Sequence, residues 1–224
     1  AEKNVMVVDA GDIVQGSLYF KLFGGQVEYP LMDMMGYDIQ ILGNHEFDNG
    51  IDSLARFYPA TKTVKLSSNY DFTGTPLEGV FVPWTVREVE GKRVGFLGLN
   101  LNPEGMIAPG ATGAMKFNDI IGAANRTAEF LRKKEKCDVV IAVSHIGYED
   151  KDNPQLTMDP EVAAKSKDID IIIGGHSHTL ISPVDSRLPY RIKNAGGKDV
   201  IVTQTGRYGA KIGKIDVDLR NPRK

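Results

Sequence analysis

The sequence has little cysteine, no excess of either charge and no long apolar run. Its 224 residues include one cysteine, which excludes an intrachain disulfide and leaves the redox compartment undecided. Lys and Arg number 27 against 29 Asp and Glu, so the charge gives no attraction to nucleic acid or to an anionic membrane. No apolar run approaches the roughly 18 residues of a transmembrane helix. The composition therefore argues against nucleic-acid-binding and membrane-spanning proteins.

The beginning of the sequence also lacks a recognisable signal peptide. The first residue is Ala1 rather than Met, so we expect processing or truncation upstream. The length suits one sizeable α/β domain, and we see no linker or internal repeat, so we treat residues 1–224 as one domain. Cys137 ends a predicted helix, where a small buried thiol is expected.

The order of apolar patterns predicts a layered α/β fold. Apolar runs predict strands at residues 4–9, 39–42, 64–67, 80–90, 93–100, 138–144, 169–173, 190–193, 200–204 and 214–219. Helical spacing predicts helices at residues 26–36, 51–58, 118–136 and 159–167. The turn Glu90-Gly91-Lys92 predicts an antiparallel hairpin. This order favours the α/β class, with layered mixed β-sheets flanked by helices.

Three of these elements carry more specific expectations. The run at residues 4–9 is nearly all apolar, as in a strand buried on both faces of a parallel sheet. Asn118 is expected to cap the helix that follows it. The residues expected to face the core are Val27, Leu31, Met34 and Met35 in the helix at 26–36, and residues 120, 121, 124, 128 and 131 in the helix at 118–136.

One stretch, residues 39–50, combines a predicted strand with chemically active side chains. The strand runs into Gly43-Asn44-His45-Glu46, and Asp48 and Gly50 follow. A glycine at the carboxyl end of a strand lets the backbone turn sharply and brings the next side chains to the rim of the sheet. An ordinary turn would explain the glycines and Asn44, but it does not need His45.

The four histidines share one position in the predicted pattern. His45, His145, His176 and His178 each follow a predicted strand, and Asp12 holds the same place after the first strand. Ligands of open α/β sheets bind outside the carboxyl ends of the strands, so these side chains should converge. The alternative, scattered surface or capping histidines, requires every histidine to reach a strand end by accident.

This set of donors predicts a metal site. Imidazole with carboxylate and amide oxygen suits Zn²⁺, Mn²⁺ or Fe²⁺ rather than Ca²⁺ or Mg²⁺. In an extended segment the side chains of His176 and His178 would point to opposite faces, so we expect two neighbouring ions, one for each histidine, unless the loop curls. Two-metal sites at about 3.5–4 Å spacing are a common hydrolytic solution for phosphate esters.

The ordered motifs resemble those of the calcineurin-like metallophosphoesterases. The motifs that carry the resemblance are Gly11-Asp12, Gly43-Asn44-His45-Glu46, His145 and Gly175-His176-Ser177-His178. Gln15-Gly16 and Phe47-Asp48-Asn49-Gly50 are similar to the 5′-nucleotidase branch. The match runs from the first strand to the final strands, and it implies a binuclear metal site at the strand carboxyl ends.

The resemblance also implies a role for each metal ligand. Asp12 would bridge two divalent ions, while Asn44, His145 and His176 complete the site of one ion. His178 would bind the other ion. A hydroxide held between the ions would attack phosphorus, because the metals lower its pKa.

Three further roles follow from the same resemblance. His45 would stabilise the phosphoryl oxygens or protonate the leaving oxygen, with Asp48 holding its ring. Asn44 and His45 would both contact the substrate. Glu46 is interpreted as structural, accepting hydrogen bonds from loop amides.

The sequence departs from the family pattern at both ends. The family carries an Asp-x-His motif on an earlier strand, so we expect a fragment or an upstream segment; without that strand, one ion should bind weakly and activity should be low. Two-domain members of the 5′-nucleotidase branch also carry a carboxyl-terminal nucleotide-recognition domain, which these 224 residues do not include. We therefore expect that base recognition comes from a separate chain or a removed region, or that the protein is indifferent to the base. The candidate aromatics Tyr58, Trp84 and Tyr208 are interpreted as packing residues.

The expected function is 5′-nucleotidase-type hydrolysis of nucleoside monophosphates. A phosphodiesterase or nucleotide-sugar pyrophosphatase is the alternative among enzymes, because the same metal core serves monoesters and diesters. A non-catalytic metal-binding subunit that lacks half the site, and a structural α/β domain with incidental histidines, also stay open. The resemblance implies in addition export to the bacterial periplasm or cell surface.

Overall fold

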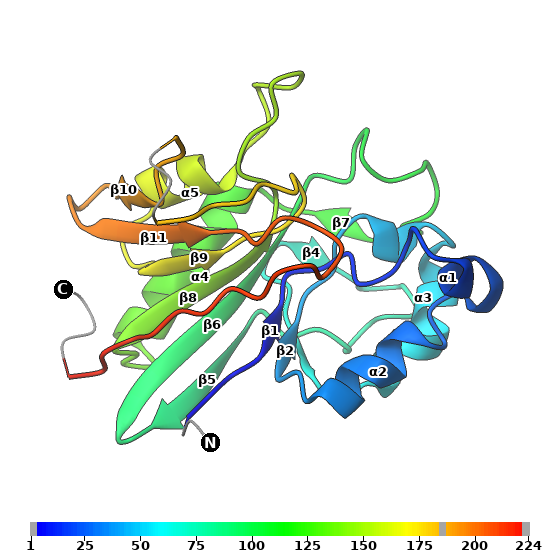
Figure 1. Cartoon of the computed structure of the whole chain (residues 1–224), viewed down its shortest axis with the longest axis horizontal. Helices are drawn as coiled ribbons and strands as arrows, with labels where there is room; N and C mark the ends of the chain where they lie inside the picture. The colour runs from blue at the N-terminus through cyan, green and yellow to red at the C-terminus, as the bar shows by residue number, and fades with distance from the viewer. Residues whose placement is uncertain (1–3, 184–186, 221–224) are drawn as a thin grey trace.

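The computed structural model describes residues 4–183 and 187–220 (Figure 1). The strands are β1 Val8–Asp9, β2 Ile39–Gln40, β3 Val64–Lys65, β4 Tyr70–Asp71, β5 Trp84–Val89, β6 Lys92–Asn100, β7 Lys116–Phe117, β8 Val139–His145, β9 Ile171–Ile173, β10 Arg191–Lys193 and β11 Asp199–Thr203. The helices are α1 Leu18–Phe23, α2 Glu28–Met35, α3 Ile51–Phe57, α4 Ile120–Lys133 and α5 Asp159–Lys165, with short 3₁₀ turns η1 His45–Phe47 and η2 Tyr58–Ala60.

Two sheets lie face to face, and helices cover their outer faces. The larger sheet has the order β10-β11-β9-β8-β6-β5, with parallel pairing from β6 through β8 and β9 to β11 and an antiparallel strand at each edge. The smaller sheet is β1-β2-β3, all parallel, and β4 and β7 form a separate pair. The expected layered mixed sheets are therefore confirmed.

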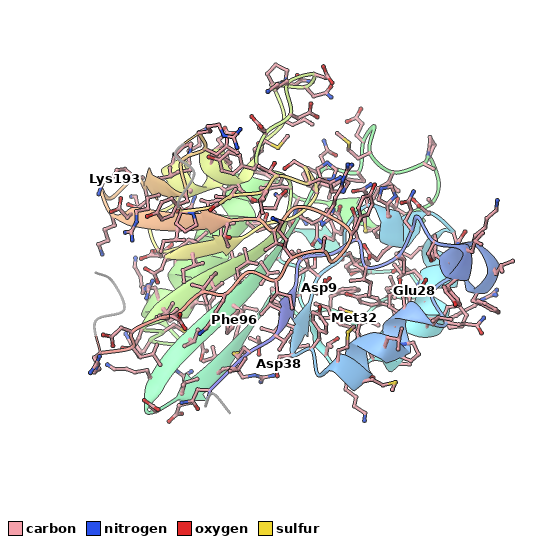
Figure 2. The ribbon with its side chains drawn as sticks, in the orientation of Figure 1. Asp9, Glu28, Met32, Asp38, Phe96 and Lys193 are labelled. Atoms are coloured by element: carbon pink, nitrogen blue, oxygen red, sulfur yellow. The ribbon has the colours of Figure 1, made fainter. Side chains whose placement is uncertain are left out.

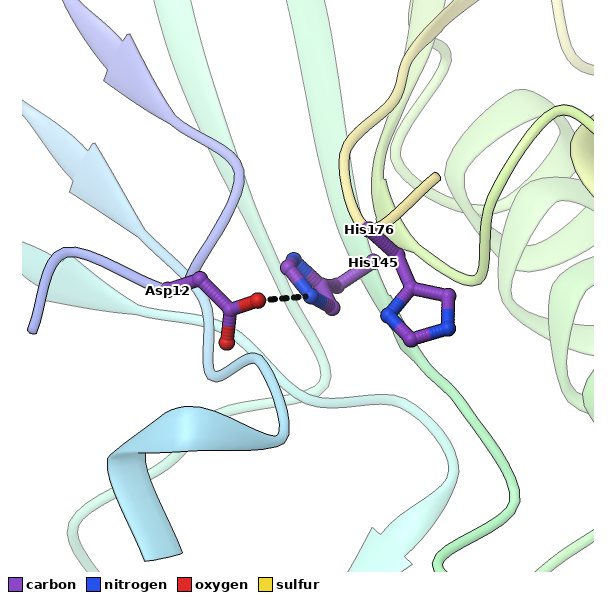
Figure 3. Close-up of side chains that lie close together, drawn as sticks. All are labelled: Asp12, His145 and His176. Carbon is purple, nitrogen blue, oxygen red and sulfur yellow. Dashed lines mark ion pairs between the residues drawn. The ribbon is translucent and has the colours of Figure 1, made fainter. Parts of the chain in front are cut away.

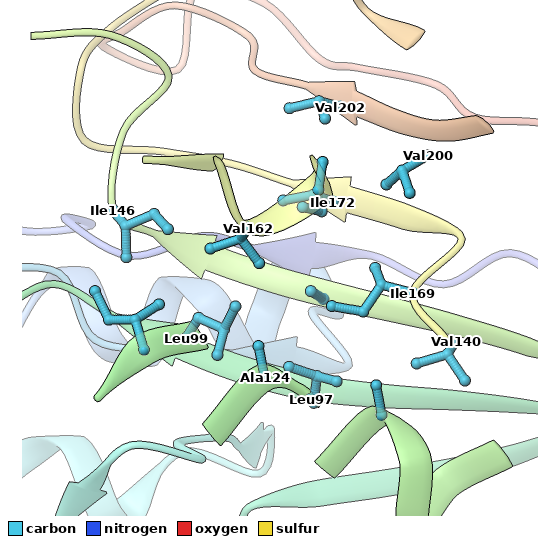
Figure 4. Packing of buried hydrophobic residues seen from close by; sticks show 14 of the residues in the cluster. Leu97, Leu99, Ala124, Val140, Ile146, Val162, Ile169, Ile172, Val200 and Val202 are labelled. Atoms are coloured by element: carbon cyan, nitrogen blue, oxygen red, sulfur yellow. The ribbon is translucent and has the colours of Figure 1, made fainter. Parts of the chain in front are cut away.

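Three hydrophobic clusters hold the layers together. One lies between the larger sheet and helices α4 and α5 (Figure 4). A second lies between the two sheets and includes Ile39, Ile41 and Phe96 of β6, the last of which is labelled in Figure 2. A third packs α1, α2 and α3 against the other side of the smaller sheet. Side chains of β8 alternate between the first two clusters, because successive residues of a strand face opposite sides.

Helix α4 follows the sequence prediction except at its cap. Its apolar stripe packs in the cluster under the larger sheet as expected, with Ala124, Ala128 and Leu131 fully buried. The cap is Asp119 rather than Asn118, since the Asp119 carboxylate accepts a hydrogen bond from the Gly122 amide. A carboxylate at this position also interacts favourably with the helix dipole, so the shift by one residue has a physical reason.

The first strand is shorter and more exposed than expected. Only Val8 and Asp9 join the ladder, and Val5 and Val7 are 58% and 36% exposed. Met6 and Val8 pack between the sheets, so the run alternates between a buried and an open side. The prediction of burial on both faces is wrong because an unbroken apolar run does not reveal whether a second layer covers it.

Helix α2 buries a different stripe from the predicted one. Leu31, Met34 and Met35 are 45%, 81% and 59% exposed, whereas Tyr29 and Met32, the latter labelled in Figure 2, are buried. The ring of Tyr29 meets Tyr58 edge to face with centroids 5.2 Å apart. Helical spacing did not decide which face is buried, and the contact of Tyr29 with Tyr58 holds the observed face against the core.

The hairpin is confirmed and the last predicted strand is not. Strands β5 and β6 pair antiparallel around Glu90 and Gly91, both with positive φ. Residues 214–219 make no ladder within the described part of the chain, although Ile215, Val217 and Leu219 pack between the sheets. Among the described residues, no helix is long and apolar enough to cross a membrane.

Candidate metal centre

Loops from both sheets meet at one edge of the molecule. Strands β1 and β2 of the smaller sheet lead to Asp12 and Asn44, and β8 and β9 of the larger sheet lead to His145 and His176. Figure 3 shows Asp12 and His176 on either side of the His145 ring. The convergence expected from the strand ends is therefore present for these segments.

Three side chains form a group that could hold a metal ion. One ligand atom each from Asp12, His145 and His176 lies within 4.8 Å of the others. The His145 side chain is 1% exposed and that of Asp12 is 14% exposed, so the group is largely shielded from water. With Asn44 added, we call these four residues the inner group.

The hydrogen bonds of His145 decide which of its nitrogens is available. Its Nδ1 lies 2.6 Å from the Ala10 carbonyl oxygen, which can only accept, so Nδ1 carries the proton and donates. The Nε2 atom lies 2.9 Å from Asp12 Oδ2 but, among the described residues, has no contact with hydrogen-bond geometry. Either a proton or a metal ion on Nε2 would satisfy this buried nitrogen and the carboxylate oxygen beside it, so the pair suits a divalent ion.

The electrostatics of this pair agree with that interpretation. Burial works to lower the pKa of His145, but the carboxylate of Asp12 and the Ala10 carbonyl raise it above its ordinary value. Burial works to raise the pKa of Asp12, but contacts with His145 and the His45 amide lower it. The site therefore favours positive charge next to an ionised Asp12.

His176 completes the inner group together with Asn44. Its Nδ1 lies 3.0 Å from Asn44 Oδ1. Burial and the neighbouring imidazole of His145 lower the pKa of His176 to about 4, and His178 and His45 add smaller effects in the same direction. A neutral imidazole beside an amide oxygen is the state in which both can bind a metal ion.

Glu46 holds the backbone that carries part of the inner group. Its carboxylate accepts hydrogen bonds from the amides of Asp12 at 3.1 Å, Ile13 at 2.9 Å and Gly43 at 2.5 Å. Burial and the charge of Asp12 raise the pKa of Glu46 to about 8, against these donors. The structural role predicted for Glu46 is confirmed, because it ties the loop after β1 to the loop after β2.

Gly43 is needed because a side chain at this position would collide with its neighbours, and not because the backbone turns sharply there. Its φ is not in the left-handed region, but an added Cβ would lie 2.7 Å from His145 Cε1 and closer still to Asp12 Oδ1. Gly11, with φ of 87°, would place a Cβ 2.8 Å from His145 Nδ1. Glycine therefore allows the two loops to approach His145 closely.

His45 and Asp48 lie beside the inner group. The short turn η1 brings His45 Nδ1 to 3.0 Å from Asp48 Oδ2, as the spacing of three residues predicts. Their side chains are 35% and 36% exposed, so solvent and substrate can reach them. The contact is confirmed, and the catalytic roles of both residues stay predictions.

His178 is not a member of the inner group. It is exposed, and its ring centroid is 6.4 Å from that of Tyr208. His176 and His178 both have positive φ, 73° and 55°, so the segment that carries them is a tight turn. The assignment of His178 to a second ion stays a prediction.

The aromatic residues agree with the predicted packing roles. Tyr58 is fully buried, and Trp84 packs against Phe130 with centroids 5.3 Å apart. Tyr208 is 83% exposed at the surface. These three rings lie in separate places, and they form no aromatic pair.

Comparison with known proteins places these motifs in a family. The sequence profile described as calcineurin-like phosphoesterase matches residues 1–180. The chain belongs to this family. Its members use divalent metal ions and hydrolyse phosphoric esters, which agrees with the donors of the inner group.

Relatives with more specific functions are also similar to this phosphoesterase. A 5′-nucleotidase precursor from Thermus thermophilus is 34% identical, with a TM-score of 0.78 over 91% of this chain and 40% of that one. The NAD nucleotidase of Haemophilus influenzae is 30% identical, with a TM-score of 0.77 and the same coverage. A trifunctional nucleotide phosphoesterase of Bacillus subtilis is 31% identical over 95% of this chain and 16% of its own length. The phosphoesterase chain spans two fifths or less of each of these proteins.

Sequence reasoning missed a polar cavity that borders the inner group. The cavity has a volume of about 350 Å³ and is lined by Glu149, Asp150 and Lys151 after β8 and by His176, Ser177 and Thr179 after β9. The signal in the sequence was the charged run that follows His145, but a charged run is usually a solvated loop. It also missed Gln204, whose side chain bonds to the turn that carries His176 and His178.

Proposed function

We propose that this phosphoesterase chain is the metal-dependent catalytic region of an enzyme that releases phosphate from nucleoside 5′-monophosphates. The observation that carries the proposal is the meeting of Asp12, His145 and His176 within 4.8 Å, beside His45 and Asp48. Similarity to proteins described as 5′-nucleotidases, at 30–34% identity, supports the choice of substrate.

Two divalent ions are part of this proposal. Asp12, Asn44, His145 and His176 would hold one ion, and His178 would contribute to the site of the other, with Asp12 shared. Zn²⁺, Mn²⁺ and Fe²⁺ suit these donors. When bound, such ions activate water at neutral pH and offset the charge of the phosphoryl oxygens.

The protein's own groups prepare the site before any ion binds. The Ala10 carbonyl fixes the tautomer of His145, so Nε2 faces Asp12 with its lone pair. Glu46 fixes the backbone of Asp12 and Gly43, and the His45 amide donates to Asp12 Oδ1 at 2.8 Å. The ligands therefore lose little freedom when they bind a metal ion.

His45 is proposed to act on the substrate directly. Asp48 accepts a hydrogen bond from His45 Nδ1, which leaves Nε2 for a phosphoryl oxygen or for the leaving oxygen. When the ring is protonated, Nε2–H can donate its proton to the departing alkoxide. Asn44 and His45 are adjacent, so both are proposed to contact the phosphate group.

A second candidate function has a specific observation behind it. The similarity to a protein described as an NAD nucleotidase favours a pyrophosphate or diester substrate with the same metal core. The polar cavity beside His176 would leave room for a second substituent on phosphorus. A separate chain or a further region that recognises the nucleotide, and export to the periplasm or cell surface, also belong to the proposal.

The test measures metal content and phosphate release together. The full-length protein is stripped with a chelator, reloaded with Mn²⁺, Zn²⁺ or Fe²⁺, and assayed with AMP, NAD and bis(p-nitrophenyl) phosphate. Phosphate release from AMP that requires the metal supports the 5′-nucleotidase. Preference for NAD or the diester supports the second candidate, and metal binding without any hydrolysis supports a non-catalytic subunit.

A further inference from the structure

The turn that carries His176 and His178 is held in an unfavourable backbone conformation. Both residues have positive φ, which side chains larger than glycine seldom adopt. Such conformations persist when surrounding contacts determine them. The contacts that hold this turn therefore decide where His176 lies.

Gln204 supplies these contacts from the end of β11. Its Oε1 accepts hydrogen bonds from the Thr179 amide at 2.5 Å and from Ser177 Oγ at 3.1 Å. Its Nε2 donates to the Gly175 carbonyl at 2.7 Å. The Gln204 side chain thus bonds to residues 175, 177 and 179 of the turn. It makes no hydrogen bond to the two histidines between them, His176 and His178.

The position of Gln204 is itself well fixed. The residue is 2% exposed, and its backbone carbonyl accepts a hydrogen bond from the Ile181 amide at 3.0 Å. The Gly206 amide donates to the Thr179 carbonyl at 3.0 Å. A buried side chain with both ends of its amide bonded has little freedom, so it can impose a conformation on the turn.

The same network reaches the loop that follows His145. Ser177 Oγ, which donates to Gln204, accepts a hydrogen bond from the Tyr148 amide at 2.9 Å. The loops that follow β8 and β9 are therefore tied together next to His145 and His176. Movement of the His176 turn would disturb the loop after His145 as well.

We propose that Gln204 is a positioning residue that sets the His176–His178 turn before a divalent ion binds. This inference rests on the metal-binding part of the proposed function. Gln204 contacts the backbone and Ser177 rather than the imidazole rings, so its effect is on where the ligands lie. Loss of its hydrogen bonds should let the turn relax and weaken metal binding.

The test compares Gln204→Met with a substitution of a matched buried amide in the turn between β10 and β11. Methionine fills a similar volume without the hydrogen bonds. Asn194 is 6% exposed at the opposite end of β11; its Oδ1 accepts from the Gly196 and Lys198 amides and its Nδ2 donates to the Lys167 carbonyl. Asn194→Leu removes a comparable network far from the metal centre.

Two measurements use the full-length protein without relying on activity. Calorimetric titration of the metal-free protein with Mn²⁺ should show affinity reduced roughly 10–100-fold in Gln204→Met and by less than about threefold in Asn194→Leu. Hydrogen exchange of the metal-free protein should be faster at residues 175–179 in Gln204→Met alone. Gln204→Glu keeps the acceptors and loses the donor to Gly175, so an intermediate affinity is expected.

The outcomes separate this inference from the proposed function. Wild-type Mn²⁺ affinity and unchanged exchange in Gln204→Met would overturn the positioning role, and so would an equal loss of affinity in Asn194→Leu. Wild-type protein that binds Mn²⁺ and releases no phosphate would overturn the proposed function and leave the role of Gln204 intact.

Discussion

The inner group and His178 differ in how their side chains are held. Within the inner group, His145 is fixed by Ala10 and Asp12 by the His45 amide, and both are shielded from water. His178 is exposed and rests against the exposed ring of Tyr208. The difference teaches that this protein holds the inner group in its packed interior and leaves His178 near the surface.

A side chain at position 43 should have the largest effect, because it would disrupt the inner group and leave His178 unchanged. In Gly43→Ala the new methyl group would collide with Asp12 and His145, so folding stability should fall by about 1–3 kcal/mol or more and the inner group should lose its ion. Thermal unfolding and metal analysis check this. The control is Gly196→Ala, whose Cβ would meet Asn194 Oδ1 at 3.3 Å; a Gly43→Ala protein with normal metal content would contradict the packing argument.

Removal of the negative charge of Asp12 should have the second largest effect, in this case on catalysis and metal binding. Asp12→Asn should reduce kcat/KM by roughly 10³-fold, equivalent to about 4 kcal/mol, because the shared carboxylate is lost. Metal analysis should show lower occupancy at both positions. Loss of a single ion would contradict a bridging role, and Asp52→Asn, on the surface of α3, serves as the control.

His45→Ala should separate chemistry from metal binding. We expect kcat to fall roughly 10²–10⁴-fold, which is the usual contribution of a positioned acid or base. Metal content should stay near normal, because His45 is not proposed as a metal ligand. Steady-state kinetics and metal analysis on the same sample measure both. Parallel loss of metal and activity would show that His45 acts as a ligand instead.

His178→Ala should have the smallest effect on the fold. Because the side chain is exposed, the melting temperature should change little, whereas the second ion should bind more weakly. His145→Ala is the matched comparison, since it leaves the Asp12 carboxylate without its buried partner and should lower the free energy of unfolding by about 1–3 kcal/mol. Equal destabilisation by both substitutions would remove the distinction between the two positions.

Sequence patterns predicted the fold well where local chemistry decides the structure. The hairpin β5–β6 follows from Glu90-Gly91, and α4 follows from its apolar stripe. The predictions of the buried face of α2 and of burial on both sides of β1 were wrong, because both properties depend on which other layer packs against the element. Periodicity identifies an element, but it does not identify its neighbour.

The candidate site divides in the same way. Its donors, Asp12, Asn44 and the histidines, were visible in sequence because imidazole and carboxylate at strand ends have few structural reasons to be there. Gln204 was not visible, since a single glutamine after a strand has no chemical signature. Its importance lies in three contacts with a turn about 25 residues away in the chain, as counted from Thr179 to Gln204.

The sequence by itself determined the donor types, their order along the chain and their places at strand ends, because these depend on residue chemistry and on local backbone preference. The tertiary structure decided that ligand atoms of Asp12, His145 and His176 lie within 4.8 Å of one another and that His178 stays exposed. It also decided that position 43 must be glycine, because a Cβ there would collide with Asp12 and His145. These properties arise where two sheets meet, and contacts between distant segments are set by packing rather than by neighbouring residues.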